Sequence, residues 1–128
     1  MAGQADEIRA RYKQLFGSIP ENIEQRLSLA ERTDRIEAIE AIEQFRKVLI
    51  HDNPLEARVQ QLVHFGMLLP VGHRGPARLH AIGALKAGAS IRDLMGVCET
   101  AAIVGGMPAF SLGVSVVFEV AEQSSSPP

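Results

Sequence analysis

The chain has very little sulfur chemistry available to it, because Cys98 is the single cysteine among 128 residues. One cysteine excludes a disulfide within the chain and any Cys-x-x-Cys redox or zinc site. Cys98 falls in helical phase with the apolar residues Leu94 and Ala101, so we expect it to pack as a small hydrophobic side chain. A thiol peroxidase would need Cys98 to pair with the cysteine of a second subunit, and this function is disfavoured.

The chain also lacks blocks of like charge and long apolar runs. Its 13 Lys and Arg against 15 Asp and Glu give a formal net charge of −2, without the basic patch of a nucleic-acid-binding protein. We expect no apolar run near the ~20 residues of a membrane-spanning helix, and the start, MAGQADEIRARYK, has no hydrophobic signal core. The sequence therefore predicts a cytoplasmic protein without nucleic-acid or membrane partners.

Length and composition indicate one globular domain. A chain of 128 residues with 46% hydrophobic content is large enough for a single helical core. We expect this domain to cover residues 1–122. Residues 123–128 contain three serines and two prolines, so we expect them to form a disordered tail.

The first half of the chain has the apolar spacing of three helices. The first is predicted to stop near Gly17, and the second to cover residues 20–30. Asp34 and Glu37 then resemble a capping box that opens the third helix. The apolar face predicted for that helix consists of Ile39, Ile42, Phe45 and Leu49.

Two further segments are predicted to be helical. Asn53 and Glu56 repeat the capping-box signature and begin a fourth helix that runs to about Leu69. Residues 108–122 are β-branched enough to suit a strand, but proline at a first-turn position and the unbroken length favour a helix. Apolar residues cover more than one face of this last helix, which suggests burial against another subunit as well as its own core.

The most informative segment is residues 72–90, GHRGPARLHAIGALKAGAS. On a helix, Ala77, Ala84 and Ala87 share one face with His80, because they lie three, four and seven residues from it. An imidazole on such a face either packs against a neighbouring helix or lines a small cavity. The second alternative would make this segment the place where chemistry happens.

The boundaries of that segment complete a recognisable pattern. Gly88 can close one helix in the left-handed conformation, Ser90 with Asp93 can open the next, and Gly-Gly-Met-Pro at residues 105–108 can end it. The order H-x-x-x-A-L-x-x-G-A-S, a helix of about four turns, then G-G-M-P-A, resembles the carboxymuconolactone decarboxylase and AhpD-like family over residues 53–117. The resemblance implies an all-α, AhpD-like fold of about six to seven helices that forms homotrimers or homohexamers.

The family divides by a cysteine pair, and the chain resembles the branch without it. Peroxidase-like members carry C-x-x-C-x-x-x-H, and their two sulfur positions fall here on His73 and Pro76. An acidic residue of those members corresponds to Gln61, which cannot accept a proton at neutral pH. Residues 66–80 instead resemble the decarboxylase pattern G-M-x-x-x-x-G-R-x-x-E-L-x-L-H. A tyrosine of that branch is replaced by Val104, so the resemblance does not identify the substrate.

The resemblance implies a cofactor-independent decarboxylase or isomerase that acts on a small cyclic lactone acid of the carboxymuconolactone type. We select His80 as its general acid/base, because an unperturbed histidine pKa of ~6.5 lies close to working pH. The alternative for His80 is a hydrogen-bonded core histidine. The side chains expected to contact the substrate are Arg58, Gln61, His64, His73 and Arg74.

The polar residues allow two other interpretations. A metal site is disfavoured, because three histidines could converge but no H-E-x-x-H or comparable spacing occurs. A non-catalytic ligand-binding or assembly protein on the same oligomeric scaffold remains an alternative. The departures from the decarboxylase pattern, among them Gln60-Gln61 in place of an Arg-Glu pair, support that alternative.

Overall fold

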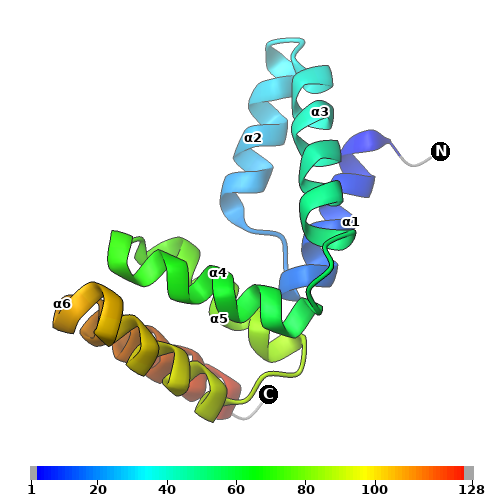
Figure 1. Ribbon diagram of the computed structural model, residues 1–128. Helices are drawn as coiled ribbons and strands as arrows, with labels where there is room; N and C mark the ends of the chain where they lie inside the picture. The colour runs from blue at the N-terminus through cyan, green and yellow to red at the C-terminus, as the bar shows by residue number, and fades with distance from the viewer. Residues whose placement is uncertain (1–2, 126–128) are drawn as a thin grey trace. The chain divides into compact units, whose positions relative to one another are not determined.

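The computed structural model describes residues 3–125 and is entirely helical over them (Figure 1). No strand occurs in this range, so the predicted all-α class is confirmed. A π-helix, η1, follows directly on the third α-helix. The elements are α1 (Gln4–Phe16), α2 (Glu21–Arg32), α3 (Ile36–Arg46), η1 (Lys47–His51), α4 (Ala57–Val71), α5 (Arg74–Lys86) and α6 (Ile91–Ser125).

The chain divides between Pro54 and Leu55 into two compact units. The N-terminal unit contains α1, α2, α3 and η1, and the C-terminal unit contains α4, α5 and α6. The single domain expected over residues 1–122 stays a prediction. Helix α6 continues through Ser125 into the expected tail, and residues 126–128 lie outside the described part of the chain.

Each of the first two helices of the N-terminal unit buries an apolar face. Ile8, Tyr12 and Phe16 of α1 are buried, and they recur at the three- to four-residue spacing of a helical stripe. Ile23 and Leu27 of α2 are buried in the same way. Helix α1 ends at Gly17, as predicted, because this glycine adopts a left-handed φ of 82° and its N–H bonds to the Lys13 carbonyl.

Both capping boxes predicted for the first half of the chain are wrong. Asp34 has a φ of 57°, a left-handed turn conformation that an N-cap residue does not adopt. Helix α3 begins instead after Arg35, without a side-chain cap. Asn53 donates its amide hydrogen to the Leu49 carbonyl at 2.9 Å, so it caps the end of the preceding helix. Helix α4 begins after Glu56, again without a side-chain cap.

The apolar face predicted for the third helix is also wrong in its orientation. Ile42, Phe45 and Leu49 are 45%, 64% and 47% exposed. The buried residue of α3 is Glu43, whose carboxylate accepts a hydrogen bond from the Tyr12 hydroxyl at 2.7 Å. This polar contact turns Glu43 toward α1, and of the predicted apolar face only Ile39 is half-buried.

The C-terminal unit is built by packing α4 against both α5 and α6 (Figure 1). The connection from α5 to α6 follows the prediction closely. Gly88 has a left-handed φ of 104°. Ser90 and Asp93 then form a reciprocal capping box, in which the Ser90 N–H bonds to Asp93 Oδ2 and the Asp93 N–H bonds to Ser90 Oγ, both at 2.9 Å.

Helix α6 consists of two helical segments separated by a break at Gly106. This glycine has φ 80° and ψ −177°, a conformation that is almost restricted to glycine. Pro108 follows in the first turn of the second segment, where its missing N–H needs no partner. The predicted stop at residues 105–108 and the predicted helix over residues 108–122 are thus both confirmed.

The length and composition of α6 correct one expectation from the sequence. Residues Ile91–Ser124 are long and apolar enough to cross a membrane, with 28% of the most apolar stretch buried. The expectation that no stretch approaches a spanning length is therefore wrong. A core helix of a globular protein meets the same criterion, and Leu94, Cys98 and Val116 of α6 are fully buried. Absence of a membrane partner stays a prediction.

Three glycines of the C-terminal unit lie directly against side chains of a neighbouring helix or helical segment. A Cβ atom on Gly66 would lie 2.9 Å from Val97 Cγ1, and one on Gly105 would lie 2.9 Å from Pro70. A Cβ atom on Gly113 would lie 2.6 Å from Cys98 Sγ. The contacts among α4 and the two segments of α6 therefore leave no room for a side chain at these positions.

Candidate functional site

The centre of the candidate site is a hydrogen bond between α4 and α5. Gln61 of α4 is 3% exposed, and its Oε1 lies 2.8 Å from Nδ1 of His80 on α5. A buried amide is stabilised when its polar atoms find such a partner. His80 itself is half-buried, so the residue keeps some contact with solvent.

A second imidazole completes this cluster. His64 lies one helical turn after Gln61 on α4, and its ring centroid is 4.7 Å from that of His80 at an interplanar angle of 79°. This edge-to-face contact is a favoured arrangement for aromatic rings. The structure therefore brings together Gln61, His64 and His80, three of the residues selected from the sequence.

The small-residue face around His80 forms a packed surface. Ala77 and Ala84 have no exposed area and belong to the main hydrophobic core. The sequence left open whether this face packs against a neighbouring helix or lines a cavity. Ala77 and Ala84 pack in the core. His80 lies at the partly exposed edge of this packed surface.

Arg58 of α4 is paired with the capping carboxylate of α6. Its Nη1 lies 3.8 Å from Asp93 Oδ2, and the two side chains are 40% and 43% exposed. The hydrogen bond from the Ser90 backbone N–H is the main reason that the pKa of Asp93 is lowered. Because the ion pair is long and open to solvent, it holds Arg58 only weakly.

Arg74 is more firmly engaged at the start of α5. It donates to Ser115 Oγ at 2.9 Å and to Glu119 Oε2 at 3.0 Å on α6. Arg78 donates to the other oxygen of Glu119 at 2.8 Å. These hydrogen bonds, the one from Arg78 first, lower the pKa of Glu119. The contacts explain Arg74 as part of the α5–α6 packing.

His73 lies apart from the His80 ring. It is the exposed N-cap residue of α5 and makes no side-chain cap. Seven residues of helix separate its position from His80 by about 10 Å along the axis. A ligand that touches both rings would have to span that distance.

Cys98 packs inside the C-terminal unit, as predicted. It has no exposed area, and burial raises its thiol pKa to about 11. A thiol with such a pKa is almost fully protonated at neutral pH and is a poor nucleophile. Within residues 3–125, no group of three or more His, Cys, Asp or Glu side chains is placed to hold a metal ion.

The larger of the two pockets characterised in the structure lies on another face. It has a volume of about 510 Å³ between α4 and α6, within the usual range of small-molecule sites. His80 is not part of its lining. Every lining residue except Thr100 is apolar, and the Thr100 hydroxyl already donates to the Gly96 carbonyl at 3.0 Å. The lining consists of Val59, Leu62, Val63, Gly66, Met67, Pro70, Val97, Thr100, Ala101 and Val104.

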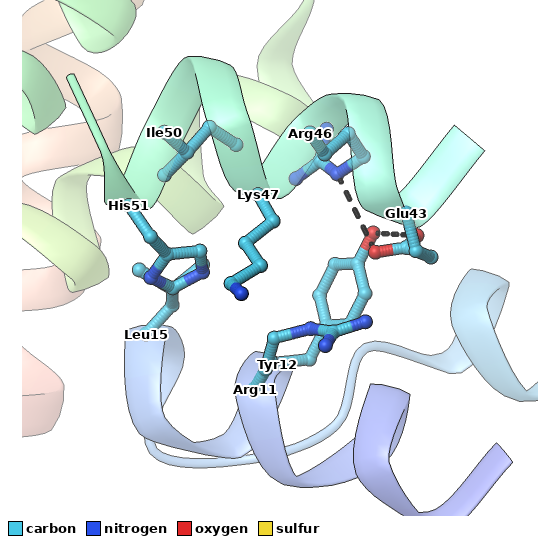
Figure 2. A pocket seen from close by; sticks show the side chains of 8 residues that line it. All are labelled: Arg11, Tyr12, Leu15, Glu43, Arg46, Lys47, Ile50 and His51. Atoms are coloured by element: carbon cyan, nitrogen blue, oxygen red, sulfur yellow. Dashed lines mark hydrogen bonds and ion pairs between the residues drawn. The ribbon is translucent and has the colours of Figure 1, made fainter. Parts of the chain in front are cut away.

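The N-terminal unit contains a polar cluster that the sequence analysis missed (Figure 2). Glu43 is 3% exposed and accepts from the Tyr12 hydroxyl, while Arg26 and Arg46 lie 3.7 and 3.9 Å from its carboxylate oxygens. Burial, followed by this hydrogen bond, raises the pKa of Tyr12 to about 12.

The pocket beside Glu43 has a volume of about 10 Å³, room for about one water molecule. The carboxylate is matched by the cations around it, which accounts for its burial. Sequence alone offered one signal, the i, i+3 spacing of Glu43 and Arg46. That spacing is equally common on solvated helix surfaces.

Comparison with known proteins decides the family. The model of the carboxymuconolactone decarboxylase family matches residues 37–119. The chain belongs to this family. The matched region contains Gln61, His64 and His80, and it excludes α1 and α2. Neither the curated proteins nor the solved structures gave a match to the chain.

Proposed function

We propose that this member of the carboxymuconolactone decarboxylase family is a cofactor-independent lyase or isomerase of a small cyclic lactone acid. His80 would serve as its general acid/base. The observation that carries the proposal is the half-buried His80 ring, held by Gln61 at 2.8 Å inside the region that matches the family.

The proposed reaction requires a proton donor that is held close to the reacting carbon. Loss of CO₂ breaks the bond between the ring carbon and the carboxylate, and the electron pair moves into the conjugated lactone carbonyl. A proton from His80 then goes to carbon. A positioned acid typically contributes about 10²- to 10⁴-fold, which corresponds to about 3 to 5 kcal/mol of barrier. Exclusion of water and donors facing the enolate would supply the rest.

The substrate carboxylate needs a cationic partner, and Arg58 is the better of the two selected arginines. Its pair with Asp93 is 3.8 Å long, so exchange for a substrate carboxylate is easy, and guanidinium binds carboxylate by two parallel hydrogen bonds. Arg74 would first have to leave both Ser115 and Glu119. His64 and His73 remain proposed contacts to the polar atoms of the lactone, whereas Gln61, which is 3% exposed and bonded to His80, would act on the lactone through that ring.

The alternative is a non-catalytic ligand-binding or assembly protein. It is favoured by the placement of the 510 Å³ pocket, which is almost entirely apolar and does not include His80. It is also favoured by the ion pairs that occupy both arginines. A thiol peroxidase is disfavoured, because the buried Cys98 thiol has a pKa of about 11.

Turnover of lactone acids separates these functions. The protein is incubated with γ-carboxymuconolactone and related unsaturated lactone acids, and ultraviolet absorbance and released CO₂ are followed. We expect turnover that falls at least about 10²-fold in His80→Ala. The control is His51→Ala, an exposed histidine of the N-terminal unit. Full turnover in His80→Ala would remove His80 from its role, and no turnover with any lactone acid would favour the binding protein.

A further inference from the structure

The contact between Gln61 and His80 fixes the position of the ring and also indicates which ring nitrogen carries the hydrogen. The atom that meets His80 Nδ1 at 2.8 Å is the amide oxygen Oε1 of Gln61. An amide oxygen accepts hydrogen bonds and cannot donate them, so the hydrogen of this bond belongs to Nδ1. A neutral imidazole has one N–H, and its other nitrogen then carries the lone pair.

We propose that Gln61 is a positioning residue that restricts proton exchange of His80 to the Nε2 atom. The neutral ring is held as the Nδ1–H tautomer, with the lone pair on Nε2. When the ring takes up a proton, that proton goes to Nε2, and Nδ1–H stays bonded to Gln61. Protonation of the carbon skeleton then returns the ring to the same tautomer. The inference rests on the acid/base role proposed for His80, but the tautomer can be measured without turnover.

Two features of the surroundings support this fixed arrangement. Gln61 is 3% exposed, so water cannot readily replace the amide as the partner of Nδ1. The ring of His64 stands edge-on to His80 at 4.7 Å, which opposes the rotation that would exchange Nδ1 with the carbon on the other side of the ring. The imidazole is thereby fixed both in its hydrogen bond and in its orientation.

A glutamine performs this task without adding charge. A carboxylate at the same position would also accept from Nδ1–H, but it would place a negative charge beside a site proposed to bind an anionic lactone acid. Like charges at such separations repel, most strongly where water is excluded. The neutral amide fixes the tautomer without adding a second negative charge beside the substrate carboxylate.

The tautomer is directly visible by ¹⁵N NMR of the protein labelled at its histidine rings, with the His80 signals assigned from His80→Ala. In the wild type we expect neutral His80 to be Nδ1–H, and we expect the second proton to appear on Nε2 as the pH is lowered. Gln61→Leu should release this preference and give a mixture of tautomers. Gln61→Glu should keep the Nδ1–H form, because a carboxylate also accepts the hydrogen bond.

Gln60→Leu is the matched control, since Gln60 is the neighbouring glutamine of α4 and is 6% exposed. It should leave the tautomer of His80 unchanged. A wild-type His80 in the Nε2–H form would overturn the inference, as would a Gln61→Leu variant that keeps Nδ1–H. If Gln61→Leu does not fold, the wild-type spectrum and Gln61→Glu decide the question.

Kinetics then separate this inference from the proposed function. With a lactone acid that is turned over, Gln61→Leu should lower kcat at least tenfold while KM changes less than threefold, and Gln61→Glu should recover part of kcat. An Nδ1–H tautomer in a protein that turns over no lactone acid would support the positioning by Gln61 and contradict the decarboxylase. Unchanged kcat in Gln61→Leu, with turnover intact in the wild type, would contradict the positioning alone.

Discussion

At the scale of single residues, two buried polar side chains form hydrogen bonds between helices. Gln61 and Glu43 are both 3% exposed, and each is bonded to a side chain from another helix of its own unit. Replacing one member of such a pair leaves the other without its partner in a place that water does not reach. The effect of substitution is therefore larger than for a polar residue at the surface.

Tyr12 provides a prediction about pH. Its pKa is raised from 10.0 to about 12, first by burial and then by the hydrogen bond to Glu43. The fold therefore favours the neutral phenol, a stabilisation that is complete below pH 10 and is lost as the pH rises through about 12. We expect the unfolding temperature to fall over this interval. Thermal unfolding followed by circular dichroism between pH 8 and 12 measures it.

Tyr12→Phe is the control for that measurement. It removes the titrating phenol, so the part of the alkaline destabilisation that comes from Tyr12 should disappear, although the variant is less stable at pH 8. Cys98 also contributes at high pH, since its pKa of about 11 is raised by burial, and Cys98→Ala identifies its share. An unchanged alkaline profile in Tyr12→Phe would show that Tyr12 does not titrate differently in the folded protein.

At the scale of helices, two capping signatures of equal spacing had opposite outcomes. Ser90 and Asp93 form both bonds of a capping box at 2.9 Å. Asp34 and Glu37 form neither, because the turn after α2 places Asp34 at a φ of 57°. The local pattern gives the chemistry of a cap, whereas the path of the chain into the helix decides whether the cap forms.

We predict that Ser90→Ala lowers the free energy of unfolding by about 1 kcal/mol, since it removes an N-cap oxygen. Urea unfolding followed by circular dichroism measures the change. Glu37→Ala is the matched control, and we expect it to change the free energy by less than about 0.5 kcal/mol, because Glu37 is exposed and makes no cap. Equal losses in both variants would contradict the capping assignment.

Sequence reasoning located the helices better than the contacts between their side chains. Gly88, Ser90 and the break at Gly106 were predictable, because each depends on the conformational preference of a few neighbouring residues. The partners of Arg58 and Arg74 were not, since Asp93 and Glu119 lie far along the chain and meet them only after the helices pack. The bond between Gln61 and His80 depends on packing in the same way.

At the scale of the whole molecule, a large apolar surface remains uncovered. The sequence suggested that the helix over residues 108–122 would be buried against another subunit as well as its own core. In the structure, Val116, Val117 and Val120 of that helix are buried in the C-terminal unit. Phe118 of the same helix is 67% exposed, and two residues that line the 510 Å³ pocket, Met67 and Val104, are 68% and 82% exposed. Such a surface is unusual for a monomer.

We propose that a second copy of the chain covers this surface, within a homotrimer or homohexamer. The double variant Met67→Lys/Val104→Glu should then dissociate into monomers, because it places charges in an apolar contact. Size-exclusion chromatography with light scattering measures the mass at micromolar concentration. Leu29→Glu, at an exposed leucine of the N-terminal unit, should keep the wild-type mass. A monomeric wild type would contradict the proposal.

The three glycines at helix contacts define where this protein tolerates variation. At Gly66, Gly105 and Gly113 even a methyl group would meet a side-chain atom at 2.6 to 2.9 Å, so alanine at any of them would force the facing side chains to move. We therefore expect substitutions in the C-terminal unit to be tolerated on the outward faces of its helices and not at these three glycines. Space for a larger ligand there would have to come from the side chains that face these glycines, such as Val97 and Pro70, because the glycines themselves have no side chain to remove.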